Sequence, residues 1–122
     1  MIRYLKRRIV AKTGSGYSPH PNKGDFSGTV FTTRGGTQNF TFTLPTPTPA
    51  LAETMYDFLN VVDFNMNVTA GANKITTFNN ATATTVSVNT SGQKIGARIS
   101  AVCDGVTWFC TGETAGVTYV VT

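Results

Sequence analysis

The sequence predicts an all-β fold, an antiparallel β-sandwich of jelly-roll-like type behind a basic N-terminal arm. Short segments rich in Thr, Val and aromatic residues recur about every ten residues, separated by Gly, Asn or Pro turns. The segment Asn39–Leu44 (NFTFTL) alternates cleanly, so that Phe40, Phe42 and Leu44 share one face. A hairpin pattern occupies residues 94–111 (KIGARISAVCDGVTWFCT), with Asp104-Gly105 as its turn.

This hairpin is expected to form the centre of the core. If Asp104-Gly105 is a two-residue loop, Cys103 pairs with Val106, Ala101 with Trp108, and Ile99 with Cys110. These side chains then share one apolar face, which carries the only tryptophan of the chain. The other face is mixed, with apolar Val102 and Phe109 among polar residues, and suits either plain surface or a subunit contact.

The two cysteines are expected to be reduced core residues. In the predicted register, Cys103 and Cys110 lie about four residues apart along the ladder, which is too far for a disulfide. No further Cys or His has the spacing of a zinc site.

The N-terminal segment reads as two parts that precede the sandwich. Residues 1–12 mix cations with apolar residues in neither helical nor strand period, which favours an arm or an edge strand. Residues 13–25 (TGSGYSPHPNKGD) read as a flexible connector, and the sandwich domain follows at 26–122. His20, the only histidine, sits between two prolines without a partner, so we expect no catalytic or metal role for it.

Outside the hairpin, the sequence predicts several short strands. Pro45, Pro47 and Pro49 end the NFTFTL strand and predict an extended surface spacer. A helix is conceivable over residues 50–60, but 55–62 (MYDFLNVV) fits a strand better. The expected strands outside the hairpin are 26–33, 39–44, 55–62, 67–69, 74–78, 84–88 and 117–121.

Composition favours a single β domain with a basic end. The chain has 122 residues, 40% apolar and only 13% charged, about half the typical charged share. The net charge is +4, and six cations but no acid fall within residues 1–23. Such an end can meet nucleic acid, an anionic surface or an acidic protein, or merely solvate itself. Neither a signal peptide nor a run of about 20 apolar residues is present, so no membrane association is expected.

We expect no enzyme, no cofactor and no metal. A lone His in a Pro-rich loop is a poor general base, and no Gly-x-Ser-x-Gly elbow, Walker loop or EF-hand loop occurs. The six acids form no evident catalytic pair. A binding or structural role is therefore favoured. Nucleic-acid binding is not expected, because the aromatics follow core patterns while the cations cluster outside them.

Two stretches resemble a β domain of tailed-phage virion proteins. They are GTVFTTRGGTQNFTFTLPTPTPA at 28–50 and GARISAVCDGVTWFCTGETAG at 96–116. The shared pattern is a Thr-Phe-Thr-Leu-Pro strand end, and later an Asp-Gly turn, a Trp and a Gly-containing tail. The resemblance implies a trimeric β domain, found in capsid decoration (cement) proteins and in tail fibres or spikes.

The expected function is therefore that of a virion structural protein, a homotrimeric capsid decoration protein that stabilises the phage head by binding the major capsid protein. It would lie on the capsid surface after assembly in the host cytoplasm, with no small-molecule ligand. The alternatives are a tail-fibre or spike domain that binds a host glycan, and a small single-stranded nucleic-acid-binding barrel. The residues expected to contact the capsid are Arg3, Tyr4, Leu5, Lys6, Arg7, Arg8 and Lys12. The expected core residues are Phe40, Phe42, Leu44, Ile99, Cys103, Trp108 and Cys110.

Overall fold

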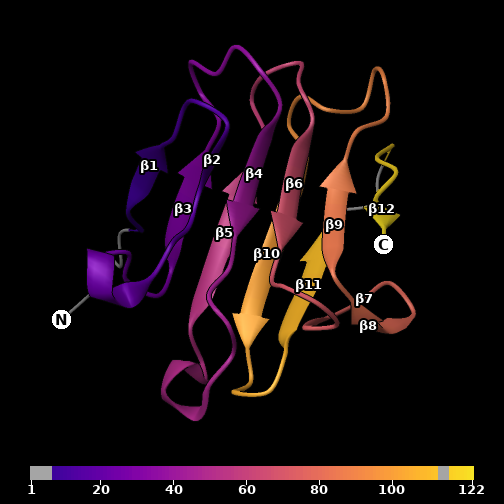
Figure 1. Cartoon of the computed structure of the whole chain (residues 1–122). Helices are drawn as coiled ribbons and strands as arrows, with labels where there is room; N and C mark the ends of the chain where they lie inside the picture. The colour runs from indigo at the N-terminus through magenta and orange to yellow at the C-terminus, as the bar shows by residue number, and fades with distance from the viewer. Residues whose placement is uncertain (1–6, 113–115) are drawn as a thin grey trace, which may run out of the picture.

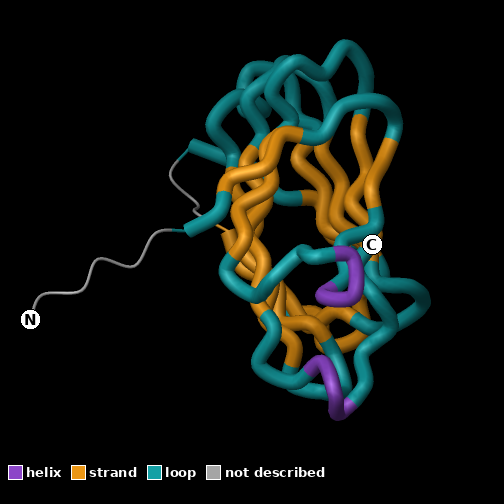
Figure 2. The backbone as a smooth tube through the Cα atoms, turned by 90° about the vertical axis from the view of Figure 1, so that its left-hand side faces the viewer, coloured by secondary structure: helices purple, strands orange, loops and turns teal. Residues whose placement is uncertain are grey.

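The computed structural model describes residues 7–112 and 116–122 and shows two β-sheets packed face to face. Figure 1 shows the strands in the two layers, and Figure 2, turned by 90°, shows the layers from the side with loops closing both ends. The prediction of an all-β sandwich is confirmed.

The larger sheet has seven strands and the smaller has five in the described part of the chain. The larger runs in the order β1 (Ile9–Ala11), β3 (Thr29–Thr32), β5 (Met55–Leu59), β10 (Arg98–Cys103), β11 (Trp108–Gly112), β7 (Ile75–Thr77) and β8 (Asn80–Ala83). The smaller runs in the order β12 (Val120–Val121), β9 (Thr85–Val88), β6 (Met66–Thr69), β4 (Phe40–Thr43) and β2 (Gly16–Tyr17). Two 3-10 turns, η1 (Pro21–Lys23) and η2 (Pro49–Leu51), lie in the loops.

The sheets are mixed, whereas the sequence predicted antiparallel ones. Parallel pairs join β1 to β3, β3 to β5, β2 to β4, β4 to β6, and β11 to β7. The chain alternates between the two sheets from β1 to β6, so strands two steps apart in sequence become neighbours in one sheet and run in the same direction. This alternation gives four of the five parallel pairs, and the fifth, β11 with β7, joins strands four steps apart in sequence.

The core lies between the sheets and is dominated by aromatic rings. All seven expected core residues are buried, none more than 2% exposed. Phe42 of the small sheet packs against Phe31 and Phe58 of the large sheet, with ring centroids 5.8 and 4.5 Å away. Trp108 stacks on Tyr56 at 6.1 Å, and its indole N–H donates to the carbonyl of Pro45 at 2.8 Å. The Pro-rich corner is thereby tied to the core.

The central hairpin forms with a longer loop than predicted. Cys103 pairs with Trp108, Ala101 with Cys110, and Ile99 with Gly112. The carboxylate of Asp104 accepts hydrogen bonds from the amides of Val106 and Thr107, both at 2.8 Å, which closes a loop over residues 104–107.

The predicted register is therefore wrong by two residues, and Val106 is 68% exposed in the loop. A shift of two preserves the face of every side chain, so the expected core is unaffected. Both cysteines are free and buried, and burial raises the pKa of Cys110 to about 12.

Described residues of the predicted arm and connector pair with both sheets. β1 adds to the edge of the large sheet and β2 to the edge of the small one. The Tyr17 ring lies 5.7 Å from that of Phe31 in β3, and its hydroxyl donates to the buried carboxylate of Asp25 at 2.6 Å. His20, predicted to lack an orienting partner, accepts the amide N–H of Asn22 at 3.0 Å and caps η1.

We expect Trp108→Ala to lower the free energy of unfolding by about 3–5 kcal/mol, because it removes a fully buried ring and orphans the Pro45 carbonyl. Denaturant unfolding measures this, with Val106→Ala as an exposed control that should stay within about 0.5 kcal/mol of wild type. A midpoint for Trp108→Ala equal to that of wild type would contradict the core assignment.

Candidate protein-binding face of the large sheet

The outer face of the large sheet carries an apolar row that crosses three strands. Side chains at paired positions point to the same side of a sheet. Met55 of β5 pairs with Val102 of β10, which pairs with Phe109 of β11. The three residues are 41%, 38% and 44% exposed. We call these three side chains the apolar row.

Two further rows complete the outer face. One consists of Ile9, Val30, Asp57, Ser100 and Thr111, and the other of Ala11, Thr32, Leu59 and Arg98. Of the residues in the three rows, only Asp57 and Arg98 are charged. The outer face is therefore broad, apolar or hydroxylated, and nearly free of charge.

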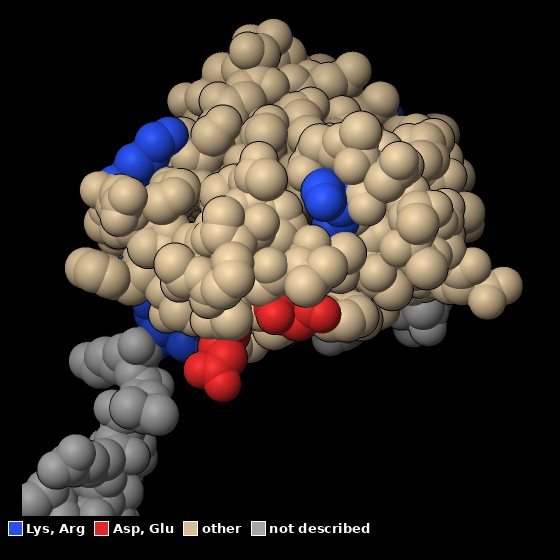
Figure 3. Space-filling model, turned by 60° about the horizontal axis from the view of Figure 1, so that its bottom comes forward, with Lys and Arg blue, Asp and Glu red and all other residues tan. Residues whose placement is uncertain are grey.

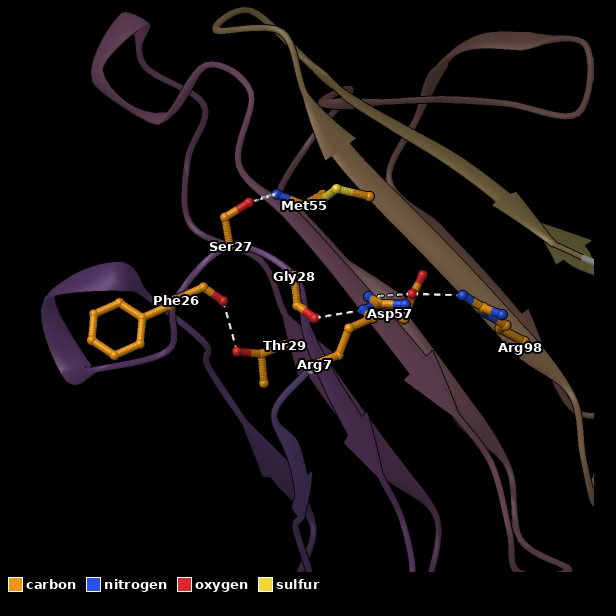
Figure 4. A network of polar contacts seen from close by, with 8 residues as sticks. All are labelled: Arg7, Phe26, Ser27, Gly28, Thr29, Met55, Asp57 and Arg98. Carbon is orange, nitrogen blue, oxygen red and sulfur yellow. Dashed lines mark hydrogen bonds and ion pairs between the residues drawn. The ribbon is translucent and has the colours of Figure 1, made fainter. Parts of the chain in front are cut away.

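Asp57 is neutralised by two arginines from distant parts of the chain. Its carboxylate lies 2.5 Å from the guanidinium of Arg7 and 2.6 Å from that of Arg98. Arg7 also donates through Nε to the carbonyl of Gly28 at 2.8 Å, as Figure 4 shows. We call these three charged residues the Asp57 clamp.

The Asp57 clamp keeps the carboxyl group of Asp57 ionised. Burial alone would raise the pKa of this carboxyl, but hydrogen bonds from Ser100, Arg98 and Arg7 outweigh that effect and lower it. Asp57 is thus ionised at neutral pH and fully occupied by its partners, so it is a poor general base or metal ligand.

The described cations of the predicted arm face their own chain. Arg7 belongs to the Asp57 clamp, and Arg8 donates to the carbonyl of Gly24 at 2.6 Å. The ammonium group of Lys12 lies 3.8 Å from the centroid of the Tyr17 ring. The structure thus gives each of the three an intramolecular contact. Arg3, Tyr4, Leu5 and Lys6 lie outside the described residues.

The described residues contain no cluster that could hold a metal ion, since no group of three or more His, Cys, Asp or Glu among them is placed to do so. Within the same residues, every buried side-chain nitrogen and oxygen has a hydrogen-bond partner. Figure 3 shows scattered charged groups on an otherwise uncharged surface at one end of the sandwich. Over residues 7–112 and 116–122, no helix has the length and apolar character to cross a bilayer.

Comparisons with known proteins give no further guide. No family model matches the chain, and searches of curated proteins and of solved structures found no significant match.

Sequence reasoning found two of the three members of the apolar row. Val102 and Phe109 were identified as apolar residues on the mixed face of the hairpin. Met55 could not be joined to them, because the pairing of β5 with β10 bridges about 40 residues of chain and leaves no local signal. The Arg7–Asp57 contact likewise joins segments 50 residues apart.

The Asp57 clamp should make stability depend on acid pH. Because the pKa of folded Asp57 is lowered, the ionised clamp stabilises the fold above the ordinary pKa of 3.8, and this contribution is lost as the pH falls through the lower, folded value. We expect Asp57→Asn to be less stable than wild type at pH 7, with the difference shrinking toward pH 2. Urea unfolding at both pH values measures it, and a pH-independent difference would contradict the assignment.

Proposed function

We propose that this chain is a structural subunit of a tailed-phage virion and, specifically, a capsid decoration protein. It acts as a homotrimer that stabilises the head by binding the major capsid protein, and it catalyses no reaction. The observation that carries the proposal is the exposed apolar row of Met55, Val102 and Phe109 on a nearly uncharged sheet face.

A face of this composition suits burial against another protein. Large contiguous apolar patches are uncommon on the surfaces of monomeric proteins and mark interaction sites. Desolvating charges opposes association, and here Asp57 is already paired inside the fold. The Asp57 clamp, with two guanidinium groups and one carboxylate, leaves one net positive charge beside the apolar row. Such a charge suits an acidic partner surface.

The sequence supports the same proposal. The stretches 28–50 and 96–116 resemble virion β domains, and they contribute β3, β4, β10 and β11. The nucleic-acid alternative gains no support from the outer face, because both arginines of the clamp share the carboxylate of Asp57 rather than standing beside exposed aromatics.

A charge placed in the apolar row tests the proposal. We expect Val102→Glu to weaken cosedimentation with empty phage heads by at least about 10-fold, because the new carboxylate would be buried without a partner. Val106→Glu is the matched control, since Val106 is 68% exposed in the loop of the same hairpin. That variant should bind heads as wild type does.

Three outcomes would contradict the proposal in different ways. Equal binding by both variants would exclude the apolar row as the contact. Binding of the wild-type chain to host cells but not to heads would favour a tail-fibre or spike domain. Salt-sensitive binding to single-stranded DNA would favour the nucleic-acid alternative.

A further inference from the structure

A groove lies between the η1 loop, residues 18–23, and the Pro-rich corner, residues 43–51. It consists of two adjoining hollows of about 380 and 500 Å³. Four residues line both hollows: His20, Asn22, Pro45 and Thr46. Among the described residues that line the groove, Lys23 alone is charged and none is an acid. The groove therefore suits a neutral or anionic ligand and disfavours a cationic one.

Both walls of the groove are held in place by hydrogen bonds. The amide of His20 donates to the buried carboxylate of Asp25 at 3.2 Å, and its carbonyl accepts the amide N–H of Lys23 at 2.9 Å. In the opposite wall, the carbonyl of Pro45 accepts the indole N–H of the buried Trp108 at 2.8 Å. A site formed in advance loses little conformational entropy when its ligand binds.

The η1 wall carries N–H donors. Nδ1 of His20 accepts the amide N–H of Asn22 at 3.0 Å, so the proton of the neutral imidazole lies on Nε2. Among the described residues, Nε2 has no hydrogen-bond partner, and this N–H can donate to a ligand. The ammonium group of Lys23 donates to the carbonyl of Ser18 at 2.7 Å and keeps two further N–H groups. Donors of this kind without a neighbouring acid favour a carboxylate as ligand.

The groove adjoins an outer face of the small sheet that carries only hydroxyl and amide side chains. Thr43 lines the groove and pairs with Thr69, which pairs with Thr85. A second row consists of Thr41, Asn67 and Ser87. All six point outward, because the residues between the two rows are buried. Figure 1 shows their strands, β4, β6 and β9, side by side. We call these six side chains the hydroxyl face.

The hydroxyl face has a different chemistry from the outer face of the large sheet. Its side chains both donate and accept hydrogen bonds, as the hydroxyl groups of sugars do. The two sheets pack face to face, so the hydroxyl face and the apolar row lie on opposite sides of the sandwich. A ligand on the hydroxyl face would leave the apolar row free for protein contact.

We propose that the groove binds an acidic polysaccharide. A carboxylate-bearing sugar unit lies at Lys23 and His20, and the polymer continues from Thr43 over the hydroxyl face. The buried lining residues Leu44 and Leu51 provide apolar area for the C–H faces of sugar rings. An acidic peptide shares the carboxylates but lacks the sugar hydroxyls that the hydroxyl face would bind. The inference goes beyond the proposed function and does not depend on it.

Three oligomers with the same number of units test the class of ligand on the free chain. Hexagalacturonate carries carboxylates on sugars, maltohexaose carries sugars alone, and hexaglutamate carries carboxylates alone. In isothermal titration calorimetry, hexagalacturonate should bind at least about 10-fold more tightly than either of the others. Equal binding of maltohexaose or of hexaglutamate, or no binding of hexagalacturonate, would overturn the inference.

Substitutions with matched controls test the place of binding. Lys23→Ala should weaken hexagalacturonate binding at least about 10-fold, whereas Lys74→Ala removes the same charge outside the groove and should bind as wild type does. Thr43→Val removes one hydroxyl at nearly constant shape and should weaken binding several-fold, with Thr111→Val on the large sheet as its control. All four positions are exposed, so the unfolding midpoints should not change. Equal losses in a variant and its control would contradict the proposed site.

Head binding separates this inference from the proposed function. Lys23→Ala should cosediment with empty heads as wild type does, because Lys23 lies outside the apolar row. If the wild-type chain binds heads but not hexagalacturonate, the inference fails and the proposed function stands. If it binds hexagalacturonate through Lys23 but no heads, the inference stands and the proposed function fails.

Discussion

The aromatic layer between the two sheets is the constraint on which the rest of the structure depends. Phe42 of the small sheet packs against both Phe31 and Phe58 of the large sheet, and these two stack with centroids 5.7 Å apart. Because side chains alternate along a strand, this inward set also fixes which residues face outward. A slip of one residue in β5 would turn Phe58 to solvent and bring Asp57 into the core. The composition of the outer face thus follows from the packing of the interior.

The Asp57 clamp links that packing to the proposed role. A carboxylate in the middle of a sheet face is costly to bury unless its charge is balanced. Arg98 supplies that balance from the neighbouring strand, and Arg7 supplies it from the segment before β1. The clamp holds the described start of the chain on the outer face and removes an unpaired charge beside the apolar row. One net positive charge remains on the clamp, so the outer face combines exposed apolar side chains with little charge, as the proposed protein contact requires.

How far the sequence predicts this protein depends on the range of each interaction. Alternation identified the strand at Phe40–Thr43 and all seven core residues, because period and burial are local properties. The hairpin loop was misjudged because the Asp104 carboxylate caps two amides and extends it. The predicted strand 74–78 includes Phe78, whereas Phe78 and Asn79 form the turn from β7 to β8 and Asn80 begins β8. The parallel pairing of β1 and β3 and the apolar row join distant segments, and no single stretch encodes them.

The central claim is that the outer face of the large sheet is covered when the protein is bound to phage heads, and hydroxyl-radical footprinting tests it most directly. Met55 and Phe109 are oxidisable side chains, 41% and 44% exposed in the free chain. Their oxidation should slow several-fold on heads, while that of Ile95 and Val106, both outside the face, should keep the rate of the free protein. Unchanged oxidation of Met55 and Phe109 in the head-bound protein would contradict the account.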